Sequence, residues 1–242
     1  MAVWWNNLVK KFVLCFIDDN RWMYMAKGLA VTMEVTLMAL VIGLLLGIVV
    51  AAVRSAHDQQ GSELSGAGGF LLGLANGICK LYLTVIRGTP MMIQLMIMYF
   101  VILVNTTNKT LVAMVAFGIN SGAYVAEIVR GGIMSIDGGQ SEAARSLGLG
   151  YLPTMRFVII PQAIKNILPA LGNELITLVK ETSIVTVIGL GDLTKGATII
   201  QGRTFEAFLP LLAAALVYLL IVVLLSWLMG KLERRLRAGD RH

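Results

Sequence analysis

The sequence predicts an all-α, polytopic membrane protein with five transmembrane helices, and three observations lead to this prediction. The chain has 242 residues, of which 57% are hydrophobic and only 14% are charged, whereas soluble domains carry about 25% charged residues. Its mean hydropathy is +0.79. Apolar runs long enough to cross a bilayer, which takes about 20 residues, recur along the chain between short polar segments.

The N-terminal segment, residues 1–27, is expected to lie in the membrane interface. Its apolar run at residues 12–17 is too short for a signal peptide, and no small-residue cleavage site follows it. The residues that can share one face of a short interfacial helix are Trp4, Trp5, Leu8 and Phe12. Such a helix would lie flat at the headgroups, with two lysines on its edge. A poorly ordered tail is the alternative.

Five apolar segments are expected to form a single transmembrane domain over residues 28–230. Their expected bounds are residues 28–53, 72–104, 110–132, 166–190 and 209–230. The second segment is expected to be kinked because Pro90 removes a backbone hydrogen bond inside it; two separate short spans are the alternative. Polar loops are expected at 54–69 and 191–208, and a basic cytoplasmic tail follows at 231–242.

The distribution of Lys and Arg orients the chain. Twelve of the 20 Lys and Arg residues fall on one side of the expected spans, seven fall on the other, and Lys180 lies within a span. Cytoplasmic loops of membrane proteins carry the excess of positive charge, so the richer side is expected to be cytoplasmic. The N-terminus is therefore expected outside, and residues 133–165 and the C-terminus are expected in the cytoplasm.

A polar interruption between the third and fourth spans predicts a short cytoplasmic helix at residues 138–148. Asp137 and Gln140 have the spacing of a capping box at its start, and Gly148 fits its end. Two adjacent alanines on this helix would let the surface of another protein come close. The helix therefore suits docking into a groove on a partner, and an ordinary loop helix is the alternative.

This segment resembles the EAA signature of ABC importer permeases. The matching residues are Glu142, Ala143, Ala144, Gly148, Val158, Ile159, Ile160 and Pro161. The usual ending of the signature is Ile-x-Leu-Pro, from which Val158 and Ile160 depart conservatively. Four further stretches are similar to the polar amino-acid branch of the family, which includes histidine-, glutamine- and arginine-type permeases: RGTPMMIQL (87–95), GAYVAEIVRGGI (122–133), GQSEAARSLGL (139–149) and PQAIKNILPALGNELITLVKETSIV (161–185).

The resemblance implies an ATP-driven importer in a bacterial inner membrane, in which this chain forms the translocation path for a polar or charged amino acid. A separate ABC ATPase subunit would dock on the 138–148 helix, the coupling helix, at Glu142, Ala143, Ala144, Leu147 and Gly148. An extracytoplasmic solute-binding protein would deliver the amino acid. A second copy of the chain or a homologous permease would complete the pore, because five spans are too few to enclose a path alone.

No catalytic residue, metal site or cofactor is expected in this chain. It lacks the Gly-x4-Gly-Lys-Ser/Thr phosphate loop, so ATP hydrolysis is expected in the partner subunit. His57 and His242 lie far apart, and Cys15 and Cys79 have no ligand-like spacing. Membrane lipid is the expected surrounding, and no nucleic-acid partner is expected.

Polar residues inside the fourth span indicate where the solute would pass. At about 100° per residue, an arc of roughly 120° contains Asn173, Glu174, Thr177, Lys180 and Glu181. Polar groups at membrane depth are costly and usually face a cavity or a partner, so this stripe predicts the wall of a water-accessible path. Pairing of Lys180 with Glu181 or Glu174 is the alternative. The expected path residues are Glu181, Lys180, Thr182, Ser183, Thr177, Asn173, Arg87 and Gln94.

Two charged positions away from this stripe have structural alternatives. Glu127 lies three residues before Arg130, which is the spacing of an intrahelical ion pair, and pairing is favoured there. Arg87 could meet a substrate carboxylate, reach a lipid phosphate or cap a helix break, and the structural role is favoured.

Two other classes of membrane protein compete with the importer. An ion-gradient-driven amino-acid transporter usually shows internal repeats and paired broken helices, whereas this sequence shows no repeat and its five expected spans do not divide into halves. A non-transporting membrane scaffold is the second competitor, and the polar stripe in the fourth span argues against it.

Overall fold

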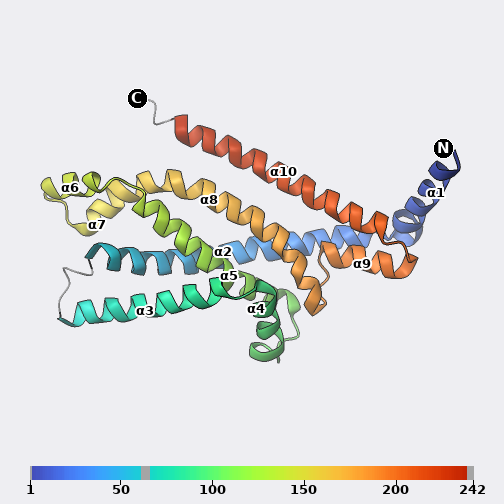
Figure 1. Cartoon of the computed structure of the whole chain (residues 1–242), viewed down its shortest axis with the longest axis horizontal. Helices are drawn as coiled ribbons and strands as arrows, with labels where there is room; N and C mark the ends of the chain where they lie inside the picture. The colour runs from blue at the N-terminus through green and yellow to red at the C-terminus, as the bar shows by residue number, and fades with distance from the viewer. Residues whose placement is uncertain (1, 61–65, 239–242) are drawn as a thin grey trace. The chain divides into compact units, whose positions relative to one another are not determined.

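The structure, a computed structural model, describes residues 2–60 and 66–238, and all its regular elements there are helices (Figure 1). The α-helices are α1 (Ala2–Phe12), α2 (Trp22–Gln60), α3 (Gly66–Gly88), α4 (Met91–Ile97), α5 (Lys109–Met134), α6 (Gly138–Ser146), α7 (Tyr151–Thr154), α8 (Ile160–Glu181), α9 (Leu193–Thr204) and α10 (Phe208–Ala238). Short π or 3-10 segments are η1 (Val13–Ile17), η2 (Asp18–Asn20), η3 (Met98–Ile102), η4 (Met155–Ile159) and η5 (Thr182–Ile188).

Four helices, α2, α3, α5 and α10, are long and apolar enough to cross a membrane. A fifth candidate is the helical stretch Tyr151–Ile188, which is followed by α9 at a bend of 49°. The described part of the chain therefore holds four or five candidate spans, and the prediction of an all-α, polytopic membrane protein is confirmed.

Helical structure extends beyond several expected boundaries. α2 continues to Gln60 and α3 begins at Gly66, so the loop expected at 54–69 is helical at both ends, and residues 61–65 lie outside the described residues. α10 likewise continues to Ala238, into the expected basic tail, whose last four residues lie outside the described part. Extending an existing helix adds one hydrogen bond per ordered residue, so polar residues with adequate helix propensity prolong it past the apolar run.

The second expected span, at 72–104, consists of two helices. α3 ends at Gly88, and α4 with η3 runs on to Ile102 after a break at Pro90. The break has the expected cause, since proline lacks the N–H group and its ring clashes with the preceding turn. α3 is long enough to span by itself, whereas Met91–Ile102 is a shorter apolar helix.

The prediction of a loop at 191–208 is wrong, because most of this segment is helix α9 (Leu193–Thr204). The Asp192 carboxylate caps the helix by accepting hydrogen bonds from the backbone N of Thr194 and Lys195, at 3.0 and 2.9 Å. One face of α9 is fully buried and consists of Leu193, Ala197 and Ile200. Their i, i+4, i+7 spacing is that of an amphipathic helix, which the surrounding Gly and Thr residues obscured.

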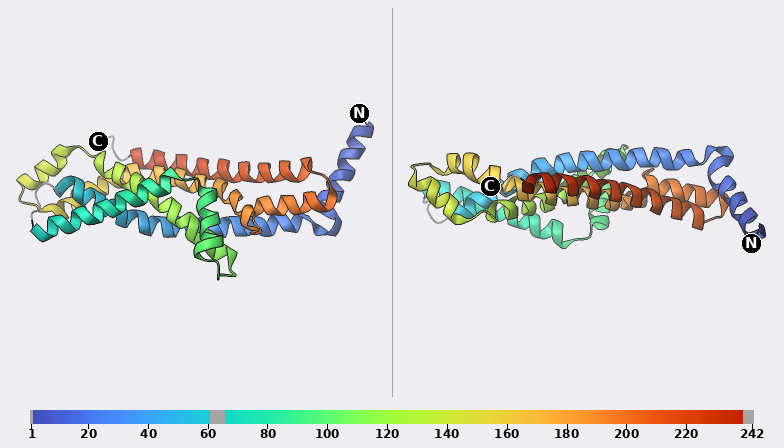
Figure 2. Two further views of the ribbon diagram at one scale, coloured as in Figure 1. Left: turned by 60° about the horizontal axis from the view of Figure 1, so that its bottom comes forward. Right: turned by 90° about the horizontal axis from the view of Figure 1, so that it is seen from above.

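The chain divides into two compact units. The first comprises Met1–Ala39, Met91–Phe117 and Ile176–Leu225, and the second comprises Leu40–Pro90, Gly118–Leu175 and Ser226–His242. In the first unit α9 lies beside the start of α2, as both views of Figure 2 show. The core there joins this face of α9 to Cys15, Phe16, Met25 and Ala214.

Close backbone contact and a buried carboxylate hold the α2–α9 pair together. A Cβ atom placed on Gly28 would stand 2.3 Å from the carbonyl oxygen of Asp192, so only glycine permits this approach. Thr32 Oγ1 accepts a hydrogen bond from the backbone N of Leu193 at 3.2 Å. Asp192 is fully buried and also accepts a hydrogen bond from the Thr186 hydroxyl at 2.6 Å. The start of α9 is therefore held by contacts with Gly28 and Thr32 of α2 and with Thr186 of η5.

Candidate functional site

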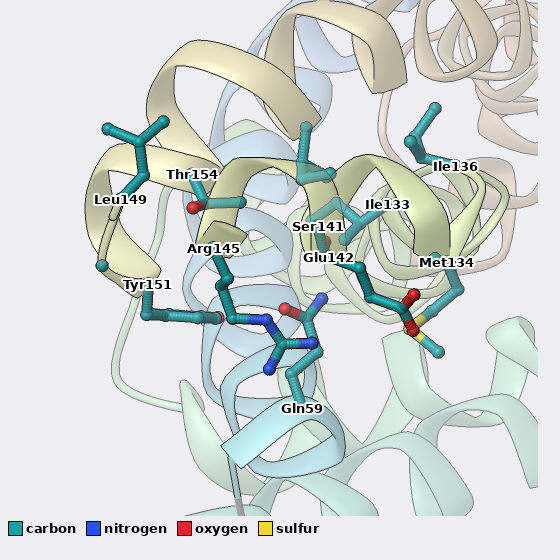
Figure 3. Close-up of a pocket in the computed structure, with 13 residues that line it drawn as sticks. Gln59, Ile133, Met134, Ile136, Ser141, Glu142, Arg145, Leu149, Tyr151 and Thr154 are labelled. Carbon is teal, nitrogen blue, oxygen red and sulfur yellow. The ribbon is translucent and has the colours of Figure 1, made fainter. Parts of the chain in front are cut away.

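Helix α6, in the second unit, forms the centre of the candidate site (Figure 3). Its N-cap is Asp137, whose carboxylate accepts a hydrogen bond from the backbone N of Gly139 at 2.6 Å. The Gln140 side chain accepts a hydrogen bond from Gln162 Nε2 at 3.3 Å, and this contact ties α6 to α8. The structure therefore contains a capped helix where the sequence predicted one.

The end of α6 is a glycine turn. Gly148 has φ +82°, its backbone N donates to Arg145 O at 2.9 Å, and Leu149 N donates to Ala144 O at 3.1 Å. Paired bonds of this kind around a left-handed residue form a Schellman-type cap. An L-residue with a Cβ atom pays about 1–2 kcal/mol for the left-handed conformation. Gly148 is thus the helix stop that the sequence predicted.

The two faces of α6 differ in exposure. Ala144 is 4% exposed and anchors the helix to its own unit, whereas Glu142 and Ala143 are exposed. Leu147, just after the helix, is 83% exposed. Glu142, Ala143 and Leu147 are therefore all accessible on the outer side of this segment.

A cavity of about 420 Å³ lies beneath α6, between this helix, the end of α5, α7 and the end of α2. Figure 3 shows the side chains of Arg145, Gln59 and Tyr151 gathered on one side of it. Thr154 lines the same cavity, and its buried hydroxyl has no hydrogen-bond partner among the described residues. The inner side of α6 is therefore loosely packed and partly polar.

The polar stripe of the fourth span lies on α8 and is graded in exposure. Asn173 and Lys180 are exposed, and Thr177 and Glu181 are half-buried. Glu174 is 9% exposed, and its carboxylate accepts a hydrogen bond from Ser121 Oγ at 2.8 Å. Glu174 belongs to the stripe expected from the sequence but not to the expected path residues, and its burial depends on Ser121 of another helix.

The residues after the stripe, Thr182 and Ser183, belong to η5 rather than to α8. Thr182 is fully buried and donates its hydroxyl hydrogen to Val179 O at 2.7 Å. Ser183 donates to Lys180 O at 2.8 Å. Because its hydroxyl hydrogen is engaged by a backbone carbonyl, the half-buried Ser183 presents only oxygen lone pairs to a ligand. Thr182 has no exposed surface to offer.

Arg87 and Gln94 lie on other helices. Arg87, on α3, has its guanidinium 5.6 Å from the ring centre of Tyr124 and 3.9 Å from the Glu127 carboxylate. Glu127 is also 3.4 Å from Arg130, so the predicted Glu127–Arg130 pair is confirmed. Gln94 is half-buried on α4, in the first unit. Within the described ranges, no three or more His, Cys, Asp or Glu side chains are grouped to hold a metal ion.

Relatives cover nearly the whole chain. The arginine transport system permease protein ArtQ of Bacillus subtilis is 40% identical over 220 residues, which cover 90% of this chain and 94% of that protein. The glutamine transport system permease protein GlnP of Escherichia coli is 37% identical over 216 residues, covering 87% and 92%. Both alignments include the α6 signature and the α8 stripe.

Two solved structures of ABC transporters are also similar to this chain. The crystal structure of an amino acid ABC transporter with histidines matches with a TM-score of 0.79 at 40% identity, covering 91% of this chain and 98% of that one. An inward-facing conformation of the MetNI methionine ABC transporter matches with a TM-score of 0.74, covering 88% and 96%, and at 20% identity it shows the shared fold alone.

A family match completes the comparison. Residues 67–238 match the family described as binding-protein-dependent transport system inner membrane component. This family is one of membrane-embedded permeases, and membership implies a separate ATPase subunit, a solute-binding protein and pairing of permeases. On the residues matched and the relatives covered, the chain belongs to the binding-protein-dependent transport system inner membrane component family.

Proposed function

We propose that this chain is the permease subunit of an ATP-driven importer and carries a polar or charged amino acid across a bacterial inner membrane. The observation that carries the proposal is the capped, outward-facing helix α6 next to a helix, α8, that bears a polar stripe. Two relatives are named for arginine and glutamine, and the similar amino acid ABC transporter was solved with histidines, which supports a polar amino acid as cargo.

The ATPase subunit is proposed to dock on the outer side of α6. Ala143 and Leu147 would supply apolar contact, Glu142 would supply charge, and Gly148 would set the turn that presents them. Ala144 has a different part, because its buried methyl group attaches α6 to the rest of its unit. An extracytoplasmic solute-binding protein and a second permease, either another copy or a homologue, complete the proposed assembly.

The solute path is proposed to run along the stripe of α8. Asn173, Thr177, Lys180 and Glu181 are the exposed or half-buried polar groups that a passing amino acid would meet. A carboxylate and an ammonium group on one face suit the two charged ends of a zwitterion. The half-buried hydroxyl of Ser183 can accept hydrogen bonds only, so it suits an ammonium group rather than a carboxylate, whereas Thr182 is fully buried and supports the turn beside it. Gln94 is a further candidate, whereas the groups around Arg87 form a separate cationic site.

Transport by reconstituted vesicles tests the proposal. The chain would be purified with its ATPase, reconstituted with ATP inside the vesicles, and supplied with its binding protein and radiolabelled arginine, histidine, glutamine or glutamate. We expect uptake of at least one of them to require ATP, to be abolished by vanadate and to survive a protonophore. Uptake driven by an ion gradient without ATP would instead establish the secondary transporter.

The orientation of the chain gives the first prediction. A cysteine at Ser146, an exposed position at the end of α6, should react with a membrane-impermeant maleimide only from the cytoplasmic side. A cysteine at Thr107, in the exposed turn before α5, should react only from outside. The reason is the excess of Lys and Arg on the α6 side. Labelling of the Ser146→Cys variant from outside would reverse the proposed topology.

Glu181→Gln gives the second prediction. If the carboxylate holds a cationic solute, the amide should weaken the binding of that solute by about 1.5–3 kcal/mol, the range for charge-assisted hydrogen bonds. The binding of a neutral amino acid should weaken less. Uptake of arginine and glutamine by the same variant measures the difference. If Glu181 only pairs with Lys180, both solutes should suffer alike, and the double variant Lys180→Met, Glu181→Gln should recover much of the loss.

A further inference from the structure

Three cationic side chains surround one cavity in the second unit, away from α6. The cavity has a volume of about 510 Å³, and its charged lining residues are Arg54 on α2, Lys80 and Arg87 on α3, and Glu127 on α5. Thr84 of α3 lies among them. Three positive charges thus face one negative charge, so the lining of the cavity carries an excess of positive charge.

Among the described residues, the carboxylates in this cluster do not balance its positive charges. Glu127 is shared, since Arg87 lies 3.9 Å and Arg130 lies 3.4 Å from the same carboxylate oxygen. Arg130 also reaches Asp58 at 3.3 Å, so four cations and two carboxylates form one cluster. The Nε atom of Arg54 is buried and has no hydrogen-bond partner among the described residues. A buried donor of this kind normally has a partner, and an anionic ligand would supply one.

An exposed apolar surface of α3 begins about 100° around the helix from its cations. At about 100° per residue from Lys80, Thr84 and Arg87 lie within roughly 40° of it. Between roughly 100° and 160° away on the same helix lie four apolar residues, which are 50 to 65% exposed: Leu74, Ile78, Leu81 and Val85. A ligand that fills both surfaces must carry an anionic group and an apolar group.

The wall of the cavity that α2 supplies lies at the depth of the headgroup region, and the long side chains of Lys80 and Arg87 meet it from α3. Arg54 is the first charged residue after the apolar run of α2 that begins at residue 35 and continues to residue 53. Long cationic side chains at the end of such a run reach the headgroups with their charged ends. Basic pockets between transmembrane helices at this depth bind anionic lipid headgroups.

We propose that this cavity binds the headgroup of an anionic phospholipid, with its acyl chains against the exposed apolar face of α3. The phosphate would lie between Arg54, Lys80 and Arg87, and Thr84 would add a hydroxyl donor. The lipid would neutralise the excess charge of the cluster and hold α2, α3 and α5 together at this point. The proposal does not depend on which solute the protein carries.

Binding of lipids to the purified full-length chain tests the proposal. In a neutral detergent, native mass spectrometry would compare phosphatidylglycerol with phosphatidylcholine of the same acyl chains. We expect a clear preference for phosphatidylglycerol, and a loss of affinity of roughly fivefold for each cation removed, in Lys80→Gln and in Lys80→Gln, Arg87→Gln. Arg156→Gln, which removes an exposed cation outside the cavity, should keep the preference.

A second variant is needed as a control, because Arg87→Gln also breaks the contact with Glu127 and could disturb the fold. Thr84→Glu keeps all the cations and places a negative charge in the cavity, so it should lower the affinity for phosphatidylglycerol as strongly as the loss of Lys80. Unchanged lipid preference in both Thr84→Glu and the double variant would overturn the proposal.

Two further outcomes separate the lipid from other anions. Glycerol phosphate or inorganic phosphate at millimolar concentration should not displace the lipid, since neither covers the apolar face; displacement at that concentration would show that the site takes a small free anion. Arginine and glutamate should not displace it either. If Lys80→Gln instead raised the KM for a solute and left lipid binding unchanged, the cations would serve the solute and the proposal would fail.

Discussion

Gly28→Val is expected to lower the free energy of unfolding by about 3 kcal/mol or more, at the upper end of what overpacking costs. The added Cβ atom would stand 2.3 Å from Asp192 O, 2.5 Å from Asp192 C and 2.8 Å from Leu193 N. These are backbone atoms, which cannot turn aside as a flexible side chain can. α2 must therefore move away from the start of α9, and the hydrogen bond from Leu193 N to Thr32 is lost with it.

Gly73→Val is the matched control. Gly73 also lies inside a long helix, α3, but a Cβ atom there would have no neighbour within 4 Å. Thermal unfolding of both variants would be monitored by circular dichroism in the same detergent. The melting temperature should fall strongly in Gly28→Val and change little in Gly73→Val. Equal melting temperatures for Gly28→Val and the unmodified chain would mean that α2 and α9 do not meet at Gly28.

Gly148→Val is expected to reduce ATP-driven uptake at least tenfold while the chain stays folded in the membrane. Valine is strongly disfavoured at φ +82°, so the Schellman-type turn after α6 should open and move Leu147 from its place. The Cβ atom itself would meet nothing within 4 Å, so the effect comes from the backbone and not from a clash. Uptake by vesicles and recovery of the ATPase with the purified permease measure it.

Gly150→Val separates the turn from the mere presence of a side chain in this loop. Gly150 has φ −71° and ψ 174°, an extended conformation that valine adopts readily, and a Cβ atom there also has no neighbour within 4 Å. We expect near-normal uptake. Gly148→Asn should fall between the two, because asparagine tolerates the left-handed region. Normal uptake by Gly148→Val would remove α6 from the coupling proposal.

The long apolar runs and the glycine stop were readable from the sequence because each rests on local chemistry. Hydrophobic length alone predicts a span, and Gly148 follows a capped, helix-forming segment. Helix α9 was missed for the opposite reason. Its apolar residues are few, and they pack against Cys15 and Phe16, which are far away in sequence. No local pattern therefore shows that this face of α9 is buried.

The candidate path also combines features that local sequence predicts with features that depend on contacts between helices. Periodicity predicts that the polar residues share one face of α8, since it needs only the helix geometry. It could not grade them, because the burial of Glu174 depends on Ser121 of another helix. Thr182, which is expected on the path because it follows Glu181, lies where the helix tightens to 3-10 geometry and is fully buried. Changes of helix type are set by tertiary contacts and leave little trace in composition.

One uninterrupted helical stretch, Tyr151–Ile188, begins just after the turn at Gly148 and contains the whole stripe of α8. No loop separates the end that adjoins α6 from the residues proposed to meet the solute. The helix proposed to meet the ATPase and the residues proposed to meet the solute are therefore joined by continuous helical backbone, which rises about 1.5 Å per residue where it is α-helical. Near the end of this stretch the Thr186 hydroxyl donates a hydrogen bond to the buried Asp192 carboxylate at 2.6 Å, so the residues that follow Glu181 are joined directly to the start of α9.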